Sequence, residues 1–131
     1  MKKIVIDLDG TLTIDSEGSY SEKPLNFDVL VACRKYKEIG FEIIISTSRN
    51  MRTYEGNVGK INVHTLPGII KWLEKHEVPY DEIHVGKPWC GFEGFYVDDK
   101  AIRPSEFLRL SYEEIQDLLA KENPYKDGGN R

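Results

Sequence analysis

The stretch Ile4-Val5-Ile6-Asp7-Leu8-Asp9-Gly10-Thr11-Leu12-Thr13 joins a short apolar run to two acids and a Gly-Thr turn. Its β-branched start is typical of a buried strand. Residues i and i+2 of a strand point to the same side, so Asp7 and Asp9 would repel each other if the strand continued. A turn at Gly10 would aim the Asp7 carboxylate and the carbonyl of residue 9 at one metal ion, while the Asp9 side chain points elsewhere. A strand followed by an ordinary Asp-Gly turn is the alternative.

The length of 131 residues suits one domain with a single sheet, and any additional cap must be small or absent. We expect this domain to span residues 1–122 and to be followed by a polar, frayed tail over 123–131. Hydrophobic residues make up 40% and charged residues 31% of the chain, and no apolar run is long enough to span a bilayer. The start, Met-Lys-Lys followed by Ile-Val-Ile-Asp, does not resemble a secretory signal, so a cytoplasmic location is expected.

The cysteines, histidines and net charge disfavour several classes of site. Cys33 and Cys90 lie far apart in different surroundings, which favours free thiols over a disulfide framework. The three histidines lack the spacing of zinc ligands. A formal net charge of -4 gives no electrostatic attraction to nucleic acid or to an anionic membrane.

Apolar periodicity and turn residues predict strands that alternate with helices, which implies parallel pairing with right-handed crossovers. Two polar segments interrupt the pattern: residues 13–24, a possible flap, and a long loop over 50–62. The predicted elements are strands over 3–8, 41–45, 83–85 and 94–97, and helices over 27–39 (capped by Asn26), over 66–76 (capped by Thr65) and after the Ser111–Glu114 capping box.

Chemically reactive residues follow the ends of four predicted strands. In an open parallel sheet, ligands bind at the carboxyl ends of the strands. Carboxylates with a hydroxyl and a lysine are suited to a hard cation, Mg²⁺ above all, together with a phosphate. These residues are Asp7, Asp9, Thr47, Lys87, Asp98 and Asp99.

In chain order, the Asp7–Thr11 stretch (DLDGT), Thr47, Lys87 and Asp98-Asp99 resemble the four motifs of the haloacid dehalogenase superfamily. More narrowly, residues 47–57 and 86–89 are similar to small capless members assigned as capsule or surface polysaccharide biosynthesis phosphatases. The resemblance implies an α/β Rossmann-like fold, with an open parallel sheet of strand order 3-2-1-4, helices on both faces and a minimal cap.

The resemblance also implies a role for each motif residue. Asp7 would be the nucleophile that forms an aspartyl-phosphate, and Asp9 would be the general acid and then the general base. Mg²⁺ would be bound by Asp7, the carbonyl of Asp9 and an acid of the fourth motif; we favour Asp98 for direct contact and Asp99 for the outer shell. Thr47 and Lys87 would hold the oxygens of the transferring phosphoryl group.

The predicted substrate-binding residues lie around these motifs. Arg49 follows Thr47 closely, and arginine recognises carboxylate and phosphate through two hydrogen bonds. A solvated loop is the competing interpretation for Arg52, and Trp89 could stack on a sugar or base or pack in a contact with another subunit. The full set is Gly10, Ser48, Arg49, Asn50, Arg52 and Trp89.

We therefore expect a Mg²⁺-dependent phosphatase that acts on a small phosphorylated metabolite, such as a sugar phosphate of surface polysaccharide synthesis. A phosphatase for nucleotides or polynucleotide ends is one alternative, which the acidic net charge disfavours. A non-catalytic module that binds a phosphorylated ligand is the other, which the complete set of motif residues disfavours. Without a large cap the site should be open, unless the 13–24 segment or another subunit of a homo-oligomer covers it.

Overall fold

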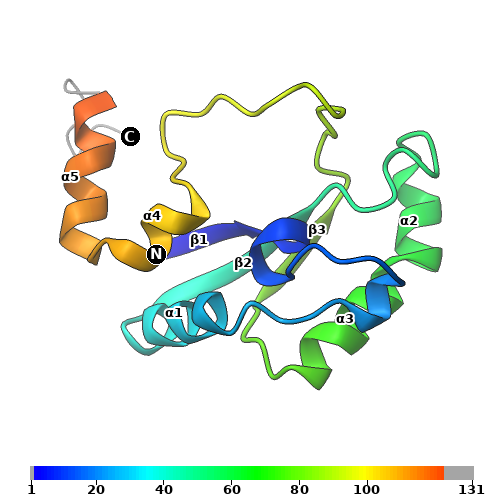
Figure 1. Ribbon diagram of the computed structural model, residues 1–131, viewed down its shortest axis with the longest axis horizontal. Coiled ribbons are helices and arrows are strands. Elements are labelled where there is room, and N and C mark those ends of the chain that lie inside the picture. The colour runs from blue at the N-terminus through cyan, green and yellow to red at the C-terminus, as the bar shows by residue number, and fades with distance from the viewer. Residues whose placement is uncertain (1, 123–131) are drawn as a thin grey trace. The chain divides into compact units, whose positions relative to one another are not determined.

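A computed structural model of the protein describes residues 2–122. The chain divides into two compact units, residues 1–89 and 90–131; Figure 1 labels their helices and strands. The first unit contains, in chain order, β1 (Lys2–Asp7), α1 (Phe27–Glu38), β2 (Phe41–Thr47), α2 (Val58–His64), α3 (Leu66–Lys75) and β3 (Glu82–Val85). The described part of the second unit contains α4 (Pro104–Arg109) and α5 (Tyr112–Glu122).

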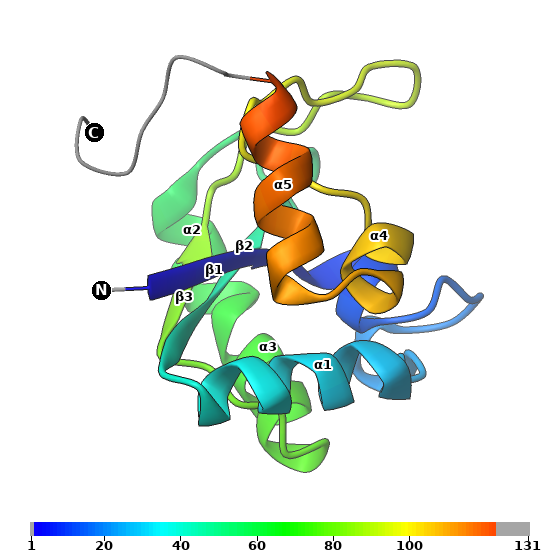
Figure 2. The same ribbon diagram turned by 90° about the vertical axis from the view of Figure 1, so that its left-hand side faces the viewer.

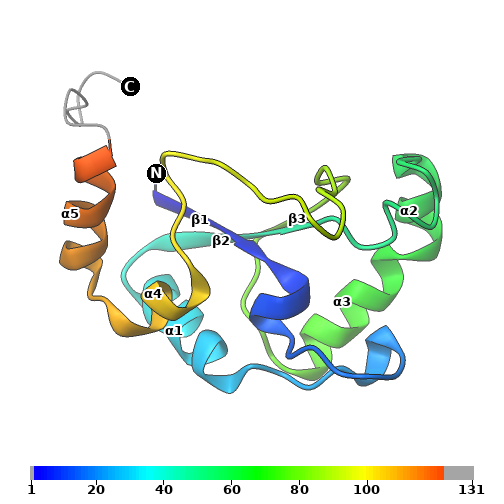
Figure 3. The same cartoon turned by 45° about the horizontal axis from the view of Figure 1, so that its top comes forward.

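The sheet of the first unit is parallel, with the strand order β1-β2-β3 (Figure 3). Asp7 is paired with Ser46, and Thr47 with Val85, so the three strands end at nearly the same level. The predicted α/β class and the order of the first three strands are confirmed. The register brings the predicted site residues of all three strands to one edge.

The core of the first unit lies between the sheet and its helices. Ile43 and Ile45 of the central strand are fully buried, and α1 and α3 lie on the same side of the sheet (Figures 2 and 3). Leu30 of α1 and Leu73 of α3 are buried as well. Each such side chain contributes about 1.5–3 kcal/mol through burial, which makes this layer the rigid support of the strand ends.

Helix caps account for where the prediction succeeded and where it was incomplete. The Asn26 side chain accepts a hydrogen bond from the amide of Val29 and begins α1, as predicted. Ser111 and Glu114 form the predicted reciprocal capping box at α5. The predicted 50–62 loop is wrong in its second half, because the Asn57 side chain accepts from the amide of Lys60 and begins α2 there.

Three further predictions differ from the structure. Thr65 precedes α3 but does not cap it with its side chain; its hydroxyl donates to the Asn50 side chain instead. A short helix, α4, begins at Pro104, where no helix was predicted. Residues 94–97 form no strand, so the predicted fourth strand beside β1 is not found among residues 2–122. A β-branched and aromatic run becomes a strand only when a neighbouring strand pairs with it.

Residues 13–24 form a short excursion that returns to its starting point. Thr13 and Leu25 form an isolated antiparallel bridge, and the amide of Ile14 donates to the carbonyl of Pro24 at 2.9 Å. The indole of Trp72 donates to the carbonyl of Lys23 at 3.0 Å. This segment is therefore held at both of its ends and against α3.

Cys33 and Cys90 are both free thiols, as predicted. Across residues 2–122, no helix has both the length and the hydrophobicity that a membrane span requires. The predicted tail, 123–131, lies outside the described residues.

Asp81, which lies just before β3, is hydrogen-bonded to α1 and β2 and provides a test of the fold. Its carboxylate accepts from Lys37 Nζ at 2.6 Å and from the amide of Ile43 at 2.8 Å. The hydrogen bond from Lys37, and then that from Ile43, hold the pKa of Asp81 below its ordinary value. Because the charged form is favoured in the folded state, its stabilisation is present above the unfolded pKa and is lost as the pH falls through the folded pKa.

We expect Asp81→Asn to lower the free energy of unfolding by about 1 kcal/mol at pH 7, a value reduced for solvent screening. The difference from the unsubstituted protein should shrink below about pH 4. Urea unfolding at several pH values measures this, with the exposed Asp117→Asn as the control. An effect that did not depend on pH would contradict the charge-based explanation.

Candidate active site at the carboxyl ends of the strands

The site begins with a tight turn directly after β1. Asp7 is the last residue of the strand, and Leu8–Leu12 form one wide turn in which the amide of Thr13 donates to the carbonyl of Leu8 at 3.0 Å. Gly10 lies inside this turn with φ at 83°, in the left-handed region that other residues rarely adopt. The turn therefore needs this glycine, and it sends Asp7 and Asp9 to different partners.

Asp7 contacts Thr11 and Lys87. The Thr11 hydroxyl donates to Asp7 Oδ2 at 3.2 Å, and Lys87 Nζ lies 3.6 Å from Asp7 Oδ1. Burial raises the pKa of Asp7, because the charged form is partly removed from water; the positive charge of Lys87 opposes this rise. The side chain keeps 36% of its exposure, so its carboxylate is accessible from solvent.

Asp9 is bound by two basic residues on the other side of the turn. Arg49 donates to it through two hydrogen bonds, Nε to Oδ2 at 2.9 Å and Nη2 to Oδ1 at 2.8 Å. Lys23 Nζ lies 3.8 Å from Asp9 Oδ1. The Arg49 side chain is only 3% exposed, and its guanidinium lies 4.2 Å from the centre of the Tyr20 ring. This arrangement is a rigid, two-point ion pair.

Backbone hydrogen bonds between the strand ends fix Thr47 and Lys87. The amide of Lys87 donates to the carbonyl of Thr47 at 3.1 Å, which extends the pairing of β2 and β3 into the following loop. The Thr47 hydroxyl accepts from the amide of Arg49 at 3.1 Å and is 1% exposed. Through this hydrogen bond Thr47 orients the chain that carries Arg49.

The remaining predicted substrate-binding residues have diverse surroundings. Gly10 is exposed and Ser48 half-buried. The Asn50 side chain donates to Thr53 and accepts from Thr65, so it holds the loop together. The guanidinium of Arg52 lies 5.9 Å from the centre of the Trp89 ring, and Trp89 is partly exposed. Arg49, by contrast, is directly hydrogen-bonded to Asp9.

Asp98 and Asp99 belong to the second unit. The Asp98 side chain accepts from the amide of Lys100 at 2.9 Å, a local turn contact. Among residues 2–122, no group of three or more histidine, cysteine, aspartate or glutamate side chains is gathered as a metal site. Residues of the first three motifs thus lie in the first unit, and the fourth motif belongs to the second.

Three contacts of the site were not among the predicted residues. Thr11 lies within the quoted motif but had no assigned role, although a hydroxyl four residues after Asp7 is a plausible partner across a turn. Lys23 and Tyr20 come from the 13–24 segment, and nothing in their local sequence indicates a contact with Asp9 or Arg49. Only the return of that segment to the strand end reveals it.

Comparison with known families accounts for this arrangement. Residues 4–71, which contain most of β1, the Leu8–Leu12 turn and Thr47, match the sequence profile of the haloacid dehalogenase-like hydrolases. The chain belongs to this hydrolase family. No curated protein is significantly similar to the chain.

Two solved structures are similar to this haloacid dehalogenase-like hydrolase. A crystal structure of an MCSG target from Vibrio cholerae is 61% identical, covers 94% of this chain and 100% of its own, and has a TM-score of 0.92. A chain of a Pnkp1/Rnl/Hen1 complex is 23% identical over 82% of this chain and 34% of its own, with a TM-score of 0.48. The first match shows that the fold is shared by a close relative.

The opposite environments of the two acids predict opposite effects of neutralising them. Because burial raises the pKa of folded Asp7, deprotonation costs stability above that pKa, so Asp7→Asn should raise the melting temperature at pH 7. The gain should vanish below about pH 4, where the acid is neutral in both states. Asp9→Asn should lower the free energy of unfolding by about 2 kcal/mol, because the buried guanidinium of Arg49 would lose its charged partner.

Thermal unfolding of both variants between pH 4 and pH 8 measures this contrast. The comparison is internally matched, since both changes replace one carboxylate of the same turn by an amide. A loss of stability in Asp7→Asn at pH 7 would mean that the Lys87 contact outweighs burial.

Proposed function

We propose that this hydrolase is a Mg²⁺-dependent phosphatase that cleaves a phosphate monoester of a small metabolite. The proposal is based on one observation: the two acids at the end of β1 have different basic partners. Asp7 is accessible and lies beside Lys87. Asp9, two residues later in the chain, is hydrogen-bonded to Arg49. Two acids with separate partners can take separate roles in one reaction.

In the first step, an oxygen of Asp7 attacks phosphorus and the bond to the leaving oxygen of the ester breaks. Asp9 delivers a proton to that oxygen, so the product leaves as an alcohol. In the second step, Asp9 takes a proton from water, which attacks the aspartyl-phosphate and releases inorganic phosphate. Lys87 lies 3.6 Å from Asp7, where its charge can also stabilise the phosphoryl oxygens.

The Arg49 pair places a condition on this chemistry. Both Asp9 oxygens accept hydrogen bonds from Arg49, so Asp9 can move a proton only after at least one of these bonds is released. A phosphate oxygen is a competing acceptor for a guanidinium. Substrate binding would therefore draw Arg49 toward the phosphate and free Asp9 at the same time, which supports Arg49 as a substrate-binding residue.

The chemistry of the donors fits Mg²⁺, which is usually bound by one or two carboxylates with waters and a phosphate. Asp7 is partly desolvated with a raised pKa, and a cation would stabilise its charged form. The ligands would be Asp7, the carbonyl of Asp9 and Asp98, with Asp99 in the outer shell. When bound, the ion would reduce the repulsion between the attacking carboxylate and the phosphate.

For the substrate we propose a small phosphorylated molecule such as a sugar phosphate. Arg52 and Trp89, which lie close together, offer a cation and a partly exposed ring to a polyhydroxyl group. The further assignment to surface polysaccharide synthesis in the cytoplasm rests on the sequence resemblance alone.

Hydrolysis of an activated aryl phosphate with Mg²⁺ tests the reaction class. We expect EDTA to stop the reaction and added Mg²⁺ to restore it. Asp7→Asn should reduce kcat at least about 10³-fold, because an amide does not replace the nucleophile. The exposed Asp28→Asn serves as the matched control and should retain activity. Full activity of the Asp7→Asn variant would contradict the assignment of Asp7 as the nucleophile.

A panel of phosphometabolites tests the substrate class, with acid-quenched samples examined by mass spectrometry for a phosphoryl group on Asp7. We expect sugar phosphates to be the best substrates. Much faster release of phosphate from nucleotides or polynucleotide ends would overturn the sugar phosphate proposal, and leave the phosphatase proposal intact.

A further inference from the structure

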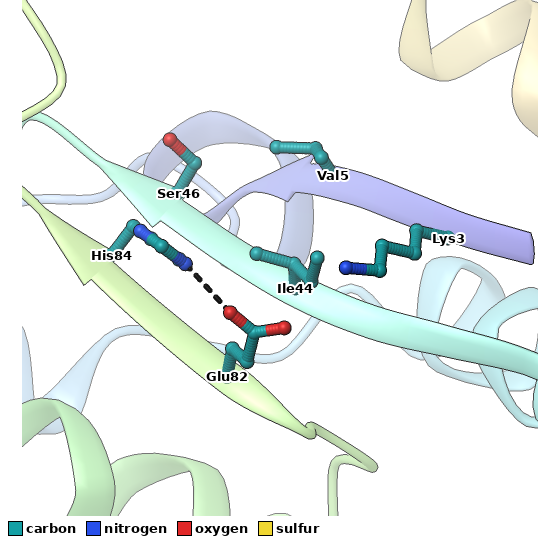
Figure 4. Close-up of a pocket in the computed structure, with 6 residues that line it drawn as sticks. All are labelled: Lys3, Val5, Ile44, Ser46, Glu82 and His84. Carbon is teal, nitrogen blue, oxygen red and sulfur yellow. Dashed lines mark hydrogen bonds and ion pairs between the residues drawn. The ribbon is translucent and has the colours of Figure 1, made fainter. Parts of the chain in front are cut away.

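The sheet of the first unit has an open edge at β1. Among residues 2–122, β1 pairs with β2 alone. Val5 of this strand is 66% exposed. Figure 4 shows that Val5 and Lys3 of β1 lie on the same face as Ile44 and Ser46 of β2. An open, apolar edge strand exposes unpaired backbone groups and is a template for another strand.

The segment over residues 94–97 has the composition of a strand but is not part of the sheet among the described residues. Its sequence, Gly-Phe-Tyr-Val, is rich in residues that favour sheets. Phe95 is 79% exposed and Val97 is 87% exposed. Phe95 and Val97 would point to the same side of a strand. Large apolar side chains that alternate in this way indicate a surface that is covered in the functional protein.

The connection from β3 is short for pairing with β1 of the same chain. A parallel strand there would lie three strand spacings, about 14 Å, from β3, and the chain would also return about 13 Å along the sheet. Parallel crossovers of this kind use a dozen or more residues. Only eight residues, 86–93, separate the end of β3 from Gly94. Lys87 is still bonded to β2, and residues 91–93 form a turn, so little extended chain remains.

We propose that residues 94–97 of one chain add to the open edge of β1 in a second copy, and that two chains exchange these segments in a two-fold dimer. A connection too short to fold back favours such an exchange, because the same strand reaches the edge of a neighbour without closing the crossover. Both copies then have four-stranded sheets, and both open edges are covered.

The exchange would also complete the site. If residues 94–97 run parallel to β1, the partner's Asp98 follows its strand end at the level of Asp7. Each site would then combine Asp7, Asp9 and Lys87 of one chain with the acidic pair of the other. The strand exchange itself is independent of the proposed function; only the role of the acidic pair rests on it.

Disulfide trapping tests the exchange without any assay of activity. In a Cys90→Ser background, the chain carrying Val5→Cys and Tyr96→Cys should form a covalent dimer on mild oxidation, seen on a non-reducing gel. Before oxidation, light scattering should give twice the 15.1 kDa chain mass. The control replaces Val5→Cys by Val63→Cys, on the exposed side of α2, and should remain uncrosslinked.

An intramolecular disulfide in a 15.1 kDa monomer would overturn the proposal, as would the absence of any disulfide. The short connection can be tested in the same way. About eight Gly and Ser residues inserted after Cys90 should relieve the constraint and convert the dimer into a monomer. A dimer that persists unchanged would show that the connection does not cause the exchange.

Complementation tests the shared site. Asp7→Asn and the double variant Asp98→Asn/Asp99→Asn should each be inactive, and refolding an equal mixture should restore about a quarter of the activity, because half of the dimers would contain one intact site of two. No recovery despite a disulfide-linked dimer would refute the shared site. If the unsubstituted protein were inactive, the proposed function would fail while the disulfide result still decided the exchange.

Discussion

The parallel register of β1, β2 and β3 is the constraint on which the rest of this structure depends. Because Asp7 pairs with Ser46 and Thr47 with Val85, three strands end at one level. The turn after β1, the chain that carries Arg49 and the loop that carries Lys87 therefore leave the sheet side by side. A shift by one residue in any pair would move each of these side chains to the other face.

The two acids of the first motif differ because of what the register places beside each. Lys87 reaches Asp7 from the end of β3, and Arg49 reaches Asp9 from the end of β2. Asp7 remains partly open to solvent with a raised pKa, while Asp9 is fixed by a buried guanidinium. In the proposed reaction the Arg49–Asp9 pair would also control proton transfer, since both Asp9 oxygens accept hydrogen bonds from Arg49 until this pair opens.

The open edge of the sheet at β1 leaves both the sheet and the proposed site incomplete in the first unit. The proposed phosphatase reaction would use Asp7 together with an acid that follows a fourth strand, yet β1 is an edge strand among residues 2–122. Exchange between two chains would solve the edge problem and the site problem together. In such a dimer the partner would also contribute surface beside the candidate active site.

The sequence alone determined the elements whose signals are local. The β-branched runs, the Asn26 cap, the Ser111–Glu114 box and the glycine of the first turn each act within a few residues, and the DLDGT motif indicated the family for the same reason. The Asn57 cap that begins α2 is also a local signal, although the prediction missed it. Only the tertiary structure decided the contacts of Lys23 and Tyr20 and the absence of a strand over residues 94–97 in the described part of the chain. Those outcomes depend on contacts between groups that are distant in the sequence. The sequence of one strand does not show which other strand it will pair with.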